Sequence, residues 1–512
     1  MKKQSLIKGT LILGISGVLA RFLGLFFRWP LQMLIGDEGV GYYQLSYPLY
    51  MFFIAAASGI PVAVSKMVSE KRAVNDDEEV ILIFRKAMLL MVVMGIGFTA
   101  LLLTFSKQII AFLKWDTKSY YSLIGIAFAP MFISIMSAFR GFYQGLQNMN
   151  PTAVSQILEQ LGRIFVGVGL AYILLPKGLE YSAGGASLGA AAGGIIGGAY
   201  LAAVYVKIRK NFKTKKIRKD TQILSKLLYM AVPISLGAAV GTVMSLIDSA
   251  LVPQKLLEAG FTHKQATILY GQLTGKAYTL INVPLTLSSA LCASLVPIIA
   301  EAFILNRNIE VKGKVNMALK FSMVIAIPSC LGLSFMAKPI LSLIFPGQSE
   351  GYEILKYLSF ALPFIVIAQT TTAILQGVGK YMSPVINLAA GCIIKIIFTL
   401  TLVPLHGLNI YGAIIGTIAG YITASILNIK LLKKTLNIHL NYYDILIKPA
   451  AASILMIILV EITYHYVYNI TISNVIAGIL SIFSGIILYV LLIPAFGILK
   501  YDDFRRRLRK EI

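Results

Sequence analysis

Apolar stretches long enough to cross a lipid bilayer recur along almost the whole of this chain. A transmembrane helix needs about 20 predominantly apolar residues. Because 57% of the 512 residues are hydrophobic and only 13% are charged, a water-soluble fold is excluded. The pattern predicts about fourteen transmembrane helices, at 9–35, 41–65, 84–106, 119–140, 151–175, 183–206, 224–251, 267–300, 315–337, 353–376, 384–404, 410–431, 446–468 and 474–498.

Lysine and arginine residues are distributed unevenly over the predicted connecting loops. With the N-terminus placed in the cytoplasm, 33 of them fall on the inside, 8 on the outside and 5 within the spans. Cytoplasmic loops of membrane proteins carry the excess of positive charge, so we expect both termini in the cytoplasm. The net charge of +24 then indicates contact with anionic membrane lipids and no binding of nucleic acid.

An internal repeat divides the chain. The turn from Gln144-Gly145 to Pro151 recurs from Gln376-Gly377 to Pro384, at offsets of 232 and 233. Two weaker matches elsewhere have similar offsets and occur in the same order in both halves of the chain. Six helices per copy give a parallel repeat, as in transporters whose substrate path lies between two halves. We therefore predict an all-α polytopic membrane protein with two six-helix lobes and two extra C-terminal helices. The parts are lobe 1–206, basic linker 207–223, lobe 224–432, helices 13 and 14 at 433–499, and a basic tail at 500–512.

Catalytic and metal-binding patterns are absent from the sequence. The three cysteines lie inside apolar runs, and the four histidines are scattered without ligand spacing. There is no Ser-His-Asp or paired-carboxylate arrangement. We expect no enzyme, no cofactor and no metal site.

Glycines at every fourth position mark one predicted helix. Gly185, Gly189, Gly193 and Gly197 share one face of the sixth segment. Small residues at this spacing let membrane helices approach closely. The run therefore predicts a tight helix contact and no phosphate-binding loop.

Two arginines seven residues apart mark the first segment. Arg21 and Arg28 lie two turns, about 10 Å, apart along one helix face. A charge at the bilayer centre is costly and usually faces a cavity or a partner. One interpretation is that both bind an anion in a cavity. The alternative is that Arg28 reaches the interface beside Trp29 while Arg21 pairs with a carboxylate.

Other charges within the spans suggest either pairing or a polar path. Lys276 begins a polar stretch of segment 8, where it lines a path or marks the outer rim. Glu159 and Arg163 stand four residues apart, as a structural ion pair would. Asp248 and Lys395 are candidates for a second pair, and a proton or cation site at Asp248 is the alternative.

The motifs Arg140-Gly141-Phe142-Tyr143-Gln144-Gly145 and Ser155-Gln156-Ile157-Leu158-Glu159-Gln160, with four shorter ones, together resemble the stage V sporulation protein B family. That family belongs to the polysaccharide-transporter branch of the multidrug/oligosaccharidyl-lipid/polysaccharide (MOP) flippase superfamily and is related to lipid II flippases. The resemblance covers segments 1 to 12 and is most specific at 140–160. The motifs are Lys8-Gly9-Thr10, Ala20-Arg21-Phe22-Leu23-Gly24, Asp37-Glu38-Gly39-Val40-Gly41, Arg140-Gly141-Phe142-Tyr143-Gln144-Gly145, Ser155-Gln156-Ile157-Leu158-Glu159-Gln160 and Leu295-Val296-Pro297.

The resemblance implies alternating access and export of an undecaprenyl-diphosphate-linked sugar to the outer leaflet, for peptidoglycan of the spore cortex or another polysaccharide. Arg21 and Arg28 stand where related flippases carry two arginines, and Lys276 lies one turn before the position of a third. Asp248 and Asn387 match residues that hold sodium in some relatives, whereas Lys395 departs from that pattern. The implied location is the bacterial cell membrane, including the forespore membrane, with cell-wall synthases as candidate partners.

Two other functions fit the sequence. A cation-coupled multidrug exporter of the same superfamily requires acidic groups in its cavity, whereas Arg21 and Arg28 favour an anionic lipid-linked substrate. A membrane scaffold that recruits cell-wall enzymes and transports nothing is the third reading.

Overall fold

The computed structural model describes residues 6–210, 212, 222–305 and 307–498. Within these ranges the chain forms helices and no strand. They belong to two compact units, Met1–Gly271 and Gln272–Ile512. Most of the predicted basic linker, 213–221, and the predicted tail at 500–512 lie outside the described residues.

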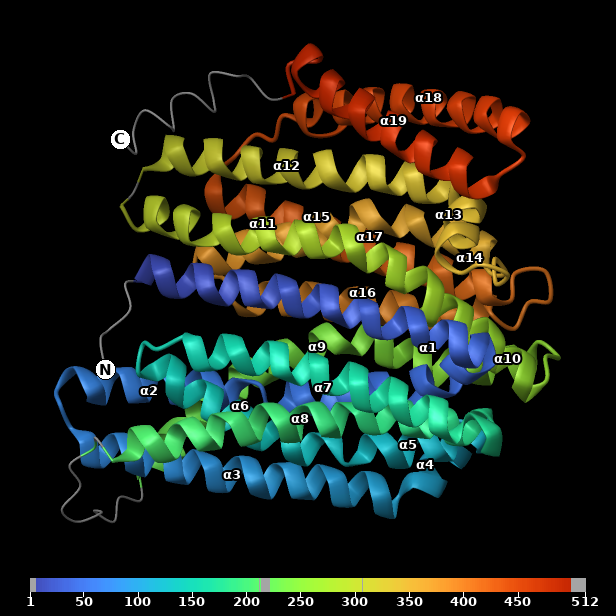
Figure 1. Ribbon diagram of the computed structural model, residues 1–512. Coiled ribbons are helices and arrows are strands. Elements are labelled where there is room, and N and C mark those ends of the chain that lie inside the picture. The colour runs from blue at the N-terminus through green and yellow to red at the C-terminus, as the bar shows by residue number, and fades with distance from the viewer. Residues whose placement is uncertain (1–5, 211, 213–221, 306, 499–512) are drawn as a thin grey trace. The chain divides into compact units, whose positions relative to one another are not determined.

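Unit 1 is a bundle of long helices joined by shorter helical elements (Figure 1). Its elements are α1 (Leu6–Ala57), α2 (Gly59–Ala73), α3 (Asp77–Thr104), α4 (Ser106–Phe112), η1 (Thr117–Ser119), α5 (Tyr120–Ala127), α6 (Ala129–Gly145), α7 (Asn150–Leu174), η2 (Leu175–Lys177), α8 (Leu179–Arg209), α9 (Gln222–Glu258) and α10 (His263–Gly271).

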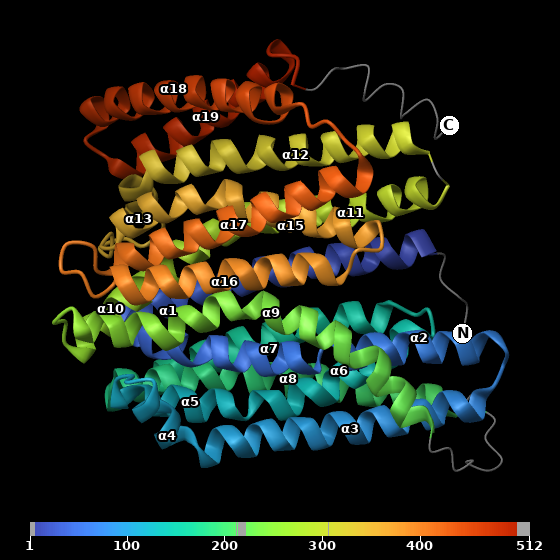
Figure 2. The ribbon, with the colours of Figure 1, turned by 180° about the vertical axis from the view of Figure 1, so that it is seen from behind.

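Unit 2 begins at a π-helical turn and ends on a helix pair, α18 and α19, that lie side by side (Figure 2). Its elements are η3 (Gln272–Ala277), α11 (Tyr278–Ile304), α12 (Asn308–Phe335), α13 (Ala337–Ile344), α14 (Tyr352–Leu358), η4 (Ser359–Ala361), α15 (Leu362–Gly377), α16 (Met382–Leu402), α17 (Ile410–Leu436), η5 (Tyr443–Ile447), α18 (Lys448–Thr471) and α19 (Asn474–Ala495).

The predicted spans coincide with helices. The first two segments meet at Gly36, whose backbone (φ 62°, ψ −170°) interrupts α1. Twelve helical stretches among the described residues are long and apolar enough to cross a membrane, and the first, Ile12–Ala73, has 62 residues. That stretch would measure about 93 Å as one straight helix, three times a bilayer core of about 30 Å. The protein is a multi-pass membrane protein, and the count of fourteen spans stays a prediction.

The helix α9 packs within unit 1, and the predicted division into two six-helix lobes stays a prediction. The backbone N–H of Gly59 in α2 donates to Ser235 Oγ of α9 at 3.0 Å. The indole N–H of Trp115 donates to the carbonyl of Ser249, also on α9, at 2.7 Å. These bonds explain why the contacts divide the chain at Gly271, whereas the sequence repeat divides it at 207–223.

The glycine face of α8 packs directly on α7, as its spacing predicts. A Cβ on Gly189 would lie 2.8 Å from the carbonyl oxygen of Arg163, and one on Gly193 would overlap that of Glu159. A Cβ on Gly197 would lie 3.1 Å from the oxygen of Ser155. The two helices lie side by side in both views (Figures 1 and 2). Only residues without a side chain allow the backbones this close.

Unit 2 repeats this arrangement in α16 and α17. A Cβ on Gly416 would lie 3.2 Å from the oxygen of Lys395, and Gly391 faces Gly420. Contact positions on α16 therefore correspond to those on α7 at an offset of 232, with Lys395 matching Arg163. The short helices α4 and α13 also occupy matching places, directly after α3 and α12.

Candidate functional site

The two arginines of the first segment lie on α1, which α7 holds in place. The hydroxyl of Ser16 donates to Gln156 Oε1 of α7 at 2.9 Å, and Phe27 is buried between these helices and α8. Arg21 is exposed and Arg28 is partly exposed. Ser16 and Phe27 thus attach α1 to its neighbours, whereas Arg21 and Arg28 retain exposed surface.

A charged layer links α6 to α7 in unit 1. Arg140 donates from Nε to Ser155 Oγ at 2.8 Å and from Nη2 to Glu159 Oε2 at 2.9 Å. The two charged side chains are only 16% and 17% exposed. A guanidinium that forms two bonds in a poorly hydrated place is held in one orientation.

The carboxylate of Glu159 pairs with Arg140, so the structure gives it a partner other than the predicted Arg163. The guanidinium of Arg163 lies over two aromatic rings, 5.5 Å from the centroid of Tyr47 and 6.0 Å from that of Phe27. Ring faces attract a cation at these distances. Sequence spacing identified a neighbour on the same helix, but Arg140 approaches from α6.

The matching layer of unit 2 contains amides instead of charges. Asn387 Nδ2 donates to Asn428 Oδ1 at 2.8 Å, and Asn428 Nδ2 donates to Thr372 Oγ1 at 3.1 Å. Asn387, a predicted coupling residue, is thus part of a neutral link among α15, α16 and α17. The sequence did not single out Asn428, which lies inside an apolar run, or the pairing of Arg140, the last residue of a predicted span.

Two other predicted charges are buried. Asp248 lies on α9 in unit 1, 2% exposed, and Lys395 lies on α16 in unit 2 with no exposed surface. Each unit therefore holds one of the two residues. Their pairing, and a cation site at Asp248, stay predictions.

Lys276 is fully buried in η3 at the start of unit 2. Its ammonium group donates to the carbonyl oxygens of Gln348 at 2.8 Å and Glu350 at 3.2 Å. Both acceptors belong to the turn between α13 and α14, where Gly351 adopts φ 82°. Lys276 therefore fixes this turn, and its role in substrate binding stays a prediction.

Comparison with known proteins finds one matching family model and related bacterial proteins. The family model described as polysaccharide biosynthesis protein matches residues 6–303. The chain is 30% identical to stage V sporulation protein B of Bacillus subtilis (strain 168), over 99% of this chain and 98% of the relative. It is 28% identical to lipid II flippase MurJ of the same organism, over 89% of this chain and 86% of that protein.

Solved structures with the same fold include a multidrug resistance MATE family transporter of the MOP superfamily in an inward-facing conformation. The TM-score is 0.69 at 15% identity, over 82% of this chain and 98% of the other. At this identity the likeness establishes the fold and leaves the substrate open.

Proposed function

Because the chain belongs to the polysaccharide biosynthesis protein family, we propose that it exports an undecaprenyl-diphosphate-linked sugar from the inner to the outer leaflet. Of the relatives, one is named a lipid II flippase, and the solved structure with the same fold is a transporter of the MOP superfamily. One of them is named for lipid II, a lipid-linked anionic precursor of the cell wall. A substrate of that chemistry needs a cationic site that water can reach.

The observation that carries this proposal is the exposure of Arg21 on α1. A charge facing hydrocarbon at the bilayer centre costs about 2.5–3.5 kcal/mol on insertion scales. Arg140 and Arg163 are partly buried, whereas Arg21 is exposed. A water-filled path along α1 gives that exposure a physical reason, and Arg21 is then the anchor for the diphosphate.

Membrane potential assists this transport. A diphosphate bears about two negative charges, and moving both outward across about 100 mV, inside negative, is favourable by about 4.6 kcal/mol. One arginine in the crossing complex leaves about half of that driving force. Two arginines cancel it, but the field then draws the empty, positively charged site back. Turnover therefore rises with potential in the absence of any ion gradient.

Proteoliposomes loaded with a radiolabelled lipid-linked sugar test the proposal. Arg21→Ala should abolish export, and Arg21→Lys should retain part of it, because lysine keeps the charge but loses the two-pronged donor. Arg85→Ala removes another exposed arginine, on α3, and serves as the matched control. Normal export by Arg21→Ala would refute the anchor. Export of a cationic dye in place of the lipid would identify a drug exporter.

We also propose that both termini face the cytoplasm of a bacterial cell, and that cell-wall synthases receive the product. A cysteine placed at 207–210 should resist an impermeant thiol reagent in intact cells, and one at 469–473 should react. The native cysteines lie inside apolar runs, so they give little background. The opposite labelling pattern would reverse the orientation.

A further inference from the structure

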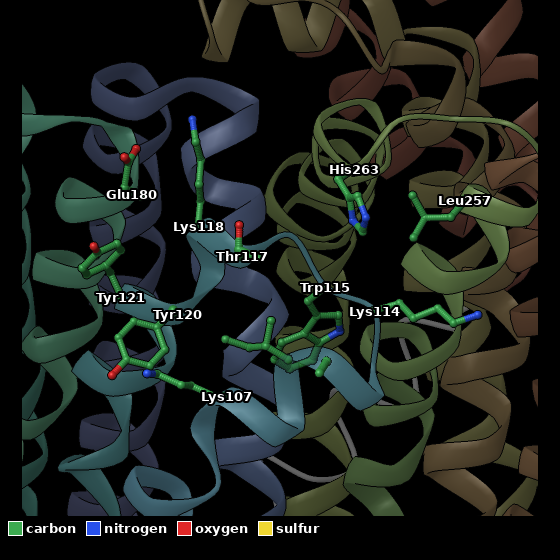
Figure 3. Close-up of a pocket in the computed structure, with 12 residues that line it drawn as sticks. Lys107, Lys114, Trp115, Thr117, Lys118, Tyr120, Tyr121, Glu180, Leu257 and His263 are labelled. Atoms are coloured by element: carbon green, nitrogen blue, oxygen red, sulfur yellow. The ribbon is translucent and has the colours of Figure 1, made fainter.

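A lysine-rich pocket of about 740 Å³ lies at one end of unit 1, remote in sequence from Arg21 and Arg28 (Figure 3). The charge distribution predicts that this end faces the outside of the cell, because the loops after α3, α7 and α9 meet there. The residues that line the pocket are Lys107, Ile110, Ala111, Lys114, Trp115, Thr117, Lys118, Tyr120, Tyr121, Glu180, Leu257 and His263.

The pocket lining has a net positive charge, because it contains three lysines and one carboxylate, that of Glu180. Lys107, Lys114 and Lys118 are exposed and form no ion pair with any of the described residues. Other lysines at this end are paired, Lys255 with Glu258 at 2.6 Å and Lys264 with Glu38 at 3.2 Å. The lysines outnumber the one carboxylate of the lining, and an anion in the pocket would be attracted by that excess of positive charge.

The base of the pocket is fixed. Trp115 is 2% exposed, and its indole N–H is bonded to the carbonyl of Ser249 on α9. The residue before it, Lys114, adopts φ 50°, a left-handed conformation that side chains other than glycine rarely take. The backbone N–H groups of Lys114 and Trp115 bond to the carbonyls of Ala111 and Ile110, so this turn closes the end of α4 and holds Trp115 in place.

Aromatic side chains supply the remaining wall. The rings of Tyr120 and Tyr121 meet edge to face, with centroids 5.6 Å apart. Tyr121 is fixed in turn by Tyr181, whose hydroxyl lies 3.2 Å from its own. Rigid tyrosines present flat apolar faces and a hydroxyl that both donates and accepts. A pyranose ring, apolar on its faces and polar at its rim, matches such a surface.

From this combination we propose that the pocket binds an anionic glycan. Its carboxylate or phosphate groups contact the three lysines, and a sugar ring lies against Tyr120 and Tyr121. The proposal depends on the export function only for the source of the glycan, which is either the exported lipid-linked unit or an acidic wall polymer. Binding itself requires no transport.

Trp115 allows this binding to be observed directly. The chain has two tryptophans, so Trp29→Phe leaves Trp115 as the only indole emitter, at the base of the pocket. The full-length protein in neutral-lipid nanodiscs is titrated with a tetrasaccharide of alternating glucuronate and N-acetylglucosamine. We expect a saturable change in emission that weakens as salt is added.

The lysines are tested as a set against a matched control. Lys107→Ala, Lys114→Ala and Lys118→Ala combined should weaken binding about tenfold, since three exposed charge contacts are lost. Lys177→Ala removes an exposed lysine outside the pocket and should leave binding unchanged. Unaltered Trp115 emission without ligand shows that the triple variant is folded. Equal affinity of the triple variant and its parent would overturn the proposal.

Further ligands identify the chemistry and the source. Neutral N-acetylglucosamine tetrasaccharide should bind at least about tenfold more weakly, because it lacks charge. Equal binding of that neutral sugar, or equal binding of inorganic phosphate alone, would overturn the anionic glycan assignment. A response only to lipid-linked sugar placed in the same nanodisc identifies the exported unit as the source, and a response to the soluble tetrasaccharide identifies a wall polymer. No response to either refutes the site and leaves the export proposal standing.

Discussion

The α6–α7–α8 layer of unit 1 and the α15–α16–α17 layer of unit 2 share one packing scheme but differ in the polar groups that link their helices. At the offset of 232, Arg140 corresponds to Thr372, Ser155 to Asn387 and Glu159 to Gly391. Unit 1 therefore uses a charge-assisted pair where unit 2 uses an asparagine from its glycine-faced helix. Both units have the close helix contact at glycine, but the polar groups that link the helices are charged in unit 1 and neutral in unit 2.

This difference predicts how strongly each layer is destabilised when one of its linking residues is substituted. A buried ion pair is most harmful when one partner is lost, because the other charge stays in a poorly hydrated place. An amide link leaves only neutral groups unsatisfied. Unit 1 should therefore be the more sensitive layer, although the helix geometry is alike.

Glu159→Ala should have the largest effect, a loss of about 3 kcal/mol in the free energy of unfolding, because Arg140 loses its carboxylate. The change is measured by reversible unfolding in mixtures of SDS and mild detergent. Arg140→Met combined with Glu159→Leu should recover most of the stability, since neither charge remains. A double variant as unstable as the single one would show that the pair acts through packing alone.

Gly193→Ala should rank second, with a loss of about 2 kcal/mol, because its methyl group would overlap the backbone oxygen of Glu159. The matched control is Gly198→Ala on the same helix, where the new Cβ would meet only Met136 Cβ at 3.7 Å. The yield of monodisperse protein and its melting temperature report both variants. Equal values for the two would contradict the tight contact.

Asn428→Ala in unit 2 should cost about 1 kcal/mol, because it removes the bridge between Asn387 and Thr372 but leaves no bare charge. The same unfolding measurement applies. Thr372→Val, which removes only the weaker end of the link, should cost less. If Asn428→Ala proved as harmful as Glu159→Ala, the proposed contrast between the layers would be lost.

Gly416→Ala should have the smallest effect, within about 0.5 kcal/mol, since alanine favours the helix over glycine by about 1 kcal/mol and offsets a mild contact. Its Cβ would lie 3.2 Å from the oxygen of Lys395, a less severe approach than at Gly193. A melting temperature close to that of the parent is expected. A loss of stability similar to that of Gly193→Ala would show that the contact at Gly416 is as tight as the one at Gly193.

The sequence by itself determined the membrane helices and the glycine contact. Backbone N–H and C=O groups in lipid must form hydrogen bonds within their own segment, so a single long apolar run crosses the membrane as a helix. The glycine spacing of four residues in α8 specified the face that packs, and the break at Gly36 fell beside a predicted segment end. These features depend on the local chain and on the solvent, and both can be read from sequence.

The tertiary structure alone decided which polar groups meet. Arg140 is 19 residues from Glu159, and Asn428 is 41 residues from Asn387. At these separations the sequence does not show which residues of two helices face each other. Lys276 bonds backbone carbonyls that exist as acceptors only because of the turn between α13 and α14. The pocket of Figure 3 likewise combines lysines that lie at separate positions of the sequence. Hydropathy acts on each segment separately, whereas a hydrogen bond requires a donor on one segment to lie about 2.7–3.2 Å from an acceptor on another.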